Sequence, residues 1–131
     1  MQNNSGAVVL YCSVLMEWGI ETMKVSVYQV VPELDQKGIL FRDLACAIKA
    51  GDGRIPSEIY ECIYSGELPV TDPEQVFVIC NSKHPEGYRG HSLSVSDVVE
   101  IQYYTGESKF FFCDSCGFPV VDFDAIKVQI K

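Results

Sequence analysis

The residues whose types and spacing could do chemistry are three cysteines and a histidine in two separate segments. Cys113 and Cys116 have two residues between them and are followed at once by Gly117, a pattern typical of a zinc knuckle. The glycine allows the backbone to turn tightly beneath the sulfurs, so that N–H groups can point at the thiolates. Upstream, Cys80 and His84 supply a second pair of ligands. This set forms a closed tetrahedral site, so the sequence predicts a structural Zn²⁺ held by Cys80, His84, Cys113 and Cys116.

The same residues admit other interpretations. Buried free cysteines are common, and Cys80, Cys113 and Cys116 could be three core thiols. A redox disulfide across the C-x-x-C pair is a weaker alternative, because neither a helix N-terminus nor a basic neighbour is evident to activate a thiol there. If His84 faces away, His91 is the substitute nitrogen ligand. Four protein ligands would leave no open position for substrate, so the ion would be structural.

Composition favours one globular domain in a reducing compartment. The chain has 131 residues, of which 47% are hydrophobic and 21% charged, and no apolar run approaches the roughly twenty residues that a membrane span needs. The apolar stretch 8–16 lacks a basic region before it and is followed by Glu17 and Trp18, which is unlike a signal peptide. We therefore expect a cytoplasmic protein with reduced cysteines and no membrane contact.

The net charge of −8 argues against direct binding to nucleic acid, because such affinity comes mainly from Lys and Arg. The eighteen acidic residues are spread through the chain without a long block. Two interpretations remain open: a solubilising surface, or an acidic decoy that occupies a basic groove on a partner.

Periodicity predicts an α+β fold, with a mainly antiparallel sheet, two short helices and a zinc-knuckle turn. Residues 1–22 form an expected N-terminal appendage and residues 23–131 a single domain, in which Met23 is a hypothetical second translation start. In the first strand, alternation places Val25, Val27 and Gln29 on one face. Helices are expected over 43–50 and from 73 to about 80, and strands over 24–31, 59–64, 92–104, 109–113, 120–121 and 125–130.

Two further groups of side chains could carry function. His91, Ser92, Ser94 and Asp97 have the residue types of a nucleophilic site, but no Gly-x-Ser-x-Gly elbow presents a serine, and a half-exposed polar strand face is the preferred interpretation. The hairpin predicted around residues 103–112 carries aromatic residues on both faces. Such a hairpin needs cover on both sides, from the N-terminal appendage, a second copy or a target protein.

Several segments in order carry a family resemblance. Residues 27–29, the aromatic strand 59–64, His84-Pro85, the run GHSLSVSDVV over 90–99, and 114–118 resemble the YodL-like domain from Met23 onward. That domain occurs in large multi-domain proteins of conjugative and phage elements in Firmicutes. The resemblance implies no catalytic residues, but it implies a mobile-element context, in which small accessory proteins often blunt host defences.

The sequence departs from the family pattern in one respect. Cys80, Cys113 and Cys116 stand where the pattern has apolar residues, and all three changes introduce the same soft ligand beside a histidine that the pattern already carries. This coincidence favours a metal site particular to this branch.

These observations together predict a non-enzymatic anti-defence protein. It would bind a host defence nuclease with a basic groove, for example as an anti-CRISPR protein, and would be folded around a structural zinc. A zinc- or thiol-dependent hydrolase is the alternative from another class, and a nucleic-acid-binding zinc module is the third. The oligomeric state is left open.

Overall fold

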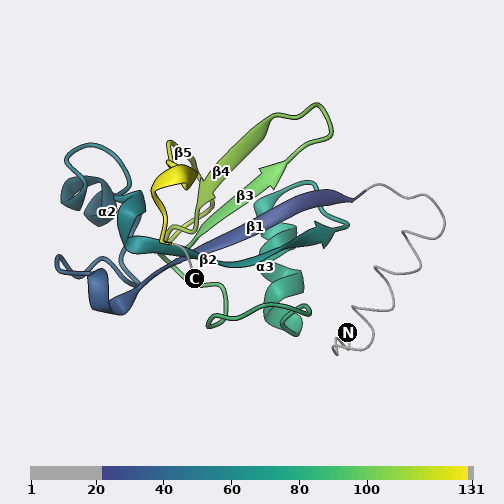
Figure 1. Cartoon of the computed structure of the whole chain (residues 1–131), viewed down its shortest axis with the longest axis horizontal. Helices are drawn as coiled ribbons and strands as arrows, with labels where there is room; N and C mark the ends of the chain where they lie inside the picture. The colour runs from purple at the N-terminus through teal and green to yellow at the C-terminus, as the bar shows by residue number, and fades with distance from the viewer. Residues whose placement is uncertain (1–21, 130–131) are drawn as a thin grey trace.

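A five-stranded antiparallel sheet forms the centre of the computed structural model, which describes residues 22–129 (Figure 1). The strand order is β2-β1-β3-β4-β5. This architecture confirms the predicted α+β class. The strands are β1 (Met23–Val30), β2 (Tyr60–Leu68), β3 (Val98–Gln102), β4 (Ser108–Phe112) and β5 (Val120–Val121), and the α-helices are α2 (Leu44–Ala50) and α3 (Pro73–Ser82).

Strand β1 is central because it pairs with both β2 and β3. Val27 lies opposite Tyr64 on β2 and opposite Val99 on β3. The pairing with β2 shifts by one residue at Ile63, which indicates a β-bulge. Val25 and Val27 are fully buried on the α3 side of the sheet, as their alternation predicts. The other face of β1 is buried as well, because Tyr28 and Val30 belong to a second core cluster.

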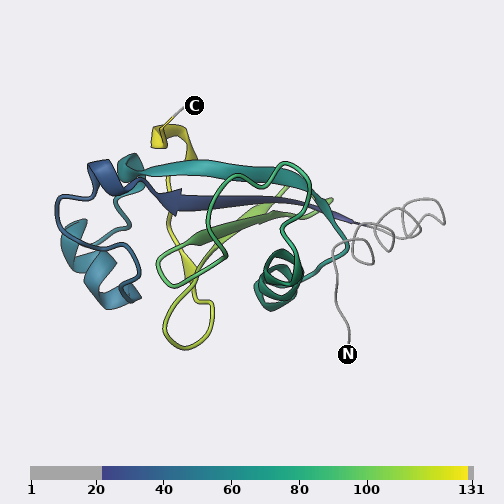
Figure 2. The ribbon, with the colours of Figure 1, turned by 90° about the horizontal axis from the view of Figure 1, so that it is seen from below.

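Helix α3 begins and ends where the sequence indicates. The Asp72 side chain accepts a hydrogen bond from the Gln75 N–H, and Pro73 occupies the first turn, where a missing N–H costs nothing. The helix ends at Ser82, since Pro85 disfavours helical backbone before it. Figure 2 shows α3 lying against one face of the sheet. There it joins a core cluster of Met23, Val25, Val27, Ile63, Tyr64, Leu68, Val70, Val76, Cys80, Leu93, Val99, Ile101 and Phe111.

Helix α2 closes the opposite end of the molecule (Figure 1). Asp43 caps it by accepting from the Cys46 N–H, and Gly51 ends it. Its buried Ala47 belongs to a second core cluster. That cluster consists of Tyr28, Val30, Ile39, Ala47, Ile55, Tyr60, Val98, Phe112 and Phe123.

One predicted strand begins later than expected, and another is wrong. Residues 92–96 form a loop instead of the start of β3, because their backbone groups bond to side chains and Ser96 has a positive φ of 88°. The segment predicted as a strand over 125–130 contains a single turn of 3-10 helix, Ala125–Lys127, which Asp124 caps through the Ile126 N–H. After it, only Gln129 bridges to β2, at Glu61. The predicted appendage 1–22 lies outside the described residues, except for Thr22. Within residues 22–129, no helix has the length and apolarity to cross a membrane.

Candidate functional site

Cys80 lies on the core side of α3. Its side chain has no exposed surface and packs in the cluster that contains Val76 and Leu93. Burial raises the pKa of the Cys80 thiol to about 12. In this position the residue behaves as a small apolar side chain, which matches the alternative interpretation of a buried thiol.

His84 follows α3 and is exposed. Its ring stacks against Tyr88 with centroids 4.3 Å apart, and its Nε2 lies 3.3 Å from the Ser92 hydroxyl. His91, the substitute ligand, is also exposed and lies beside the Phe41 ring at 5.2 Å. The His91 Nδ1 atom also lies 3.3 Å from the amide nitrogen of the buried Gln29.

The predicted knuckle turn exists as a backbone turn. Gly117 has φ of 83°, and its carbonyl accepts from the Asp114 N–H at 3.1 Å. Cys113 is buried at the end of β4, where burial, with Asp97 and Asp114 nearby, raises its thiol pKa to about 12. Cys116 is exposed at the tip of the turn. The two thiols of the C-x-x-C pair thus sit in different environments.

The structure does not gather the four predicted ligands into one site. Among residues 22–129, no three His, Cys, Asp or Glu side chains lie where they could hold a metal ion together. Cys80 belongs to the core and His84 and Cys116 to the surface, so a shared ion would require rearrangement of at least one segment. The zinc site stays a prediction.

Residues 90–97, from the stretch with the strongest family resemblance, form a loop that we call the signature loop. It wraps around a buried glutamine that sequence reasoning did not single out as functional. Gln29 is 3% exposed on β1. Its amide donates to the His91 carbonyl at 2.8 Å and to Asp97 Oδ2 at 3.0 Å, and it accepts from the His91 N–H at 3.2 Å. A Cβ at Gly90 would overlap the Gln29 Oε1 atom, so a larger residue there would displace the buried amide. The sequence offered two signals for this contact: a glutamine within an apolar strand, and a Gly-His-Ser segment later in the chain.

Asp97 is the second buried polar residue of this network. It has no exposed surface, and its Oδ2 also accepts from the Ser94 N–H at 2.8 Å. Its other oxygen, Oδ1, has no hydrogen-bond partner among the described residues. Burial raises the pKa of Asp97 well above its ordinary value, although the bonds from Ser94 and Gln29 oppose the shift.

Further hydrogen bonds tie the loop to distant elements. The Asn81 side chain at the end of α3 bonds both the N–H and the carbonyl of Leu93. The buried Tyr60 hydroxyl donates to the Ser96 carbonyl at 2.7 Å, and the Ser96 hydroxyl accepts from the Phe41 N–H at 3.0 Å. Through these hydrogen bonds the signature loop joins α3, β1 and β2.

The hydrogen bonds of this loop also show how the residues of the possible nucleophilic site are arranged. His84, not His91, is the imidazole whose ring nitrogen lies near a serine hydroxyl, that of Ser92. Asp97, the carboxylate expected to orient a base, is bonded to Gln29 and Ser94 instead. The arrangement has a serine and a base within reach of each other but lacks the third group of a triad.

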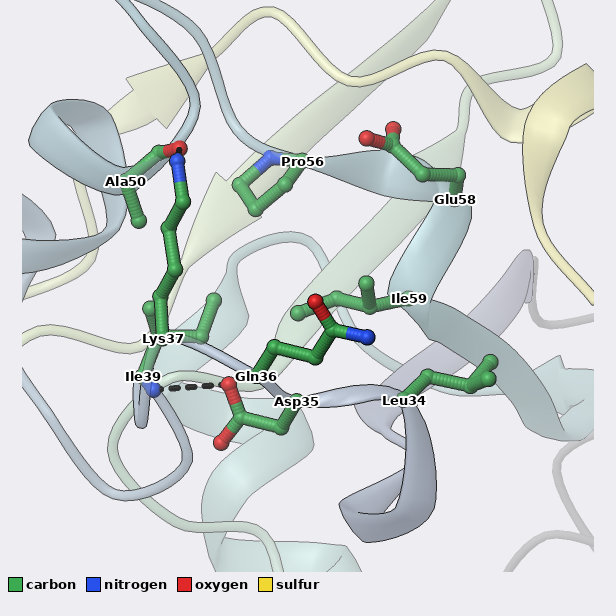
Figure 3. Close-up of a pocket in the computed structure, with 9 residues that line it drawn as sticks. All are labelled: Leu34, Asp35, Gln36, Lys37, Ile39, Ala50, Pro56, Glu58 and Ile59. Atoms are coloured by element: carbon green, nitrogen blue, oxygen red, sulfur yellow. Dashed lines mark hydrogen bonds between the residues drawn. The ribbon is translucent and has the colours of Figure 1, made fainter.

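A pocket between the turns at 32–34 and 57–59 offers no convergent polar groups. Figure 3 shows the nine side chains that line it, with the Asp35 carboxylate turned toward the Ile39 N–H. Asp35 accepts from Ile39 and Leu40, and the Lys37 ammonium donates to the Ala50 carbonyl at 2.9 Å. Asp35 and Lys37 thus hold local backbone, and Glu58 is the third charged residue of the lining.

The described surface also carries tyrosines beside acids. Tyr104 is 75% exposed at the β3–β4 turn. The neighbouring Tyr103 hydroxyl donates to the Thr71 carbonyl, just before α3, at 3.4 Å. Slight burial and then the charges of Asp72 and Glu107 raise the pKa of Tyr103. We call Asp72, Tyr103, Tyr104 and Glu107 the acidic tyrosine patch.

The fold and the site define a small α+β domain whose signature loop is held by buried polar side chains. The family model of the YodL-like domain matches residues 24–123. Because this match covers most of the chain, the protein belongs to the YodL-like domain family. Comparison with curated proteins and with solved structures gave no match.

Proposed function

We propose that this protein is a non-enzymatic anti-defence protein of a mobile element. It acts in the bacterial cytoplasm, where it binds a host defence nuclease, such as a CRISPR effector, and occludes the surface that handles nucleic acid. The observation that carries the proposal is the acidic tyrosine patch, in which an exposed Tyr104 lies next to a tyrosine whose pKa is raised in part by Asp72 and Glu107.

The patch has the chemistry that a basic groove would recognise. Carboxylates steer association with a positively charged surface, and tyrosine is among the residues that most often dominate binding energy at interfaces. The excess of acidic over basic residues in the whole chain, eighteen against ten, acts in the same direction. Membership of the YodL-like family supplies the mobile-element context.

A binding role is supported over a catalytic one by how the signature loop uses its polar groups. The Asp97 carboxylate and the Gln29 amide bond to each other and to loop backbone. Groups engaged in this way position a loop, whereas an acid or base must reach a substrate proton.

The proposal includes a structural zinc as a separate element. Its support is the C-x-x-C spacing together with the backbone pairing of Cys113, which binds the signature loop through Ser96 and Asp97. Cys80 contacts the same loop through the cluster that contains Leu93. The proposed binding to a nuclease does not depend on the ion.

The experiment is co-purification with a panel of defence nucleases, CRISPR effectors first, at low and at high salt. We expect association at low ionic strength that weakens with salt. The variant Glu107→Lys should weaken binding about tenfold or more, whereas Glu33→Lys, an equal charge change at an exposed site on another segment, should leave it unchanged. Failure of every nuclease to associate at low salt, or equal loss in both variants, would contradict the proposal.

A further inference from the structure

A groove beside α3 leaves apolar surface of the helix uncovered by the described residues. It is lined by Pro69, Asp72, Glu74, Gln75, Val78 and Ile79. Val78 is 57% exposed, although the opposite side of the same helix is buried through Val76 and Cys80. A helix that is apolar on both sides needs a partner on each.

The described chain begins next to this groove. Met23, the first residue of β1, pairs with Leu68, the last residue of β2, and Pro69 of the groove follows directly. The Thr22 hydroxyl donates to the Glu67 carboxylate on β2. Thr22, the first described residue, therefore lies at the groove's edge.

The sequence before Thr22 has the composition that an apolar groove would bind. Residues 8–20, VVLYCSVLMEWGI, contain one charged residue, Glu17, among aliphatic and aromatic ones. Thirteen residues reach about 20 Å even if they are helical, which exceeds the roughly 15 Å length of α3. Tethering raises the local concentration of such a segment to the order of millimolar.

We propose that residues 8–20 of this chain fill the groove beside α3 and cover Val78 in cis. Burial of aliphatic surface on both sides supplies the driving force, in proportion to the apolar area removed from water. This inference does not rest on the proposed nuclease target, although Asp72 belongs both to the groove and to the acidic tyrosine patch.

Trp18 is the only tryptophan of the chain, so its fluorescence reports on the proposed contact. The full-length chain should show blue-shifted emission and weak quenching by acrylamide. The variant Val78→Asp should shift the emission to that of a solvated indole and raise the quenching constant several-fold. The matched control is Val120→Asp, since Val120 is 62% exposed on β5, away from the groove, and it should leave both readouts unchanged.

Circular dichroism of Val78→Asp should show the secondary structure of the described domain retained, because Val78 is exposed and its loss creates no cavity in the described core. Thermal unfolding should occur at a somewhat lower temperature, because the proposed contact stabilises only the folded state. Three results would overturn the inference. They are a solvated Trp18 in the unmodified chain, equal emission changes in the two variants, and a Trp18 signal that depends on protein concentration, which would identify a second copy as the occupant.

Discussion

The replacement Gln29→Leu tests whether the signature loop depends on its buried glutamine. Leucine keeps much of the side-chain volume but removes the bonds that Gln29 donates to the His91 carbonyl and to Asp97, and the bond that it accepts from the His91 N–H. It also removes longer contacts of the amide nitrogen with the Tyr88 hydroxyl and the His91 ring. A neutral bond contributes about 1 kcal/mol and a bond to a charged group about 1.5–3 kcal/mol. The expected loss is therefore about 3–5 kcal/mol, a large part of the roughly 5–15 kcal/mol that stabilises a domain.

The free energy of unfolding, measured by urea titration, is the assay. The matched control is Gln102→Leu, because Gln102 is half-buried on β3 and no side-chain hydrogen bond is found for it in the described part of the chain. We expect a loss below about 1 kcal/mol for this control. Amide hydrogen exchange over residues 90–97 should accelerate in Gln29→Leu. A loss equal to that of the control, with unchanged exchange, would refute the reasoning.

Other substitutions give further predictions. Because the pKa of Asp97 is raised, its contribution to the free energy of unfolding is fully present below the unfolded-state pKa and falls as pH rises through the folded-state pKa. In urea titrations over a pH series, Asp97→Asn should remove this fall in the free energy of unfolding with pH. An unchanged pH dependence would contradict the raised pKa of Asp97. Gly90→Ala should cost about 1–3 kcal/mol through overlap with Gln29, measured by thermal unfolding, whereas a neutral effect would show that the loop yields. Without a metal, Cys80→Ser should cost about 1–3 kcal/mol and Cys116→Ser less than about 0.5 kcal/mol; equal large losses, with zinc found by elemental analysis, would favour the predicted zinc site instead.

The sequence predicted those helices and strands whose ends or faces are set by residues close to one another in the chain. The Asp72-Pro73 pair fixes the start of α3, and alternation places Val25 and Val27 together on the side of β1 that faces α3. In both cases the chemistry that decides the structure lies within a few residues, so spacing alone is sufficient.

The signature loop escaped prediction because its bonds join residues far apart in the sequence. Ser92 to Ser96 alternate like a strand, but Asp97 and Asn81 side chains bind the backbone groups that a strand would need for pairing. Gln29 lies 68 residues before Asp97, its hydrogen-bond partner. No local pattern reveals such a contact, and only the polarity of Gln29 within an apolar strand marked it.

The predicted zinc ligands form a local sequence pattern, but the structure places them in different environments. Their spacing satisfies a ligand pattern, but Cys80 belongs to the apolar face of α3 and Cys116 to an exposed turn. Residue type and spacing state which groups are available, whereas packing decides which of them meet.

The most direct test of the proposed function is the rate of target-DNA cleavage by a purified CRISPR effector titrated with this protein. The proposal predicts inhibition that saturates near one protein per nuclease and that Glu107→Lys abolishes while Glu33→Lys does not. Cleavage that continues unchanged at molar excess across the panel of defence nucleases would contradict it.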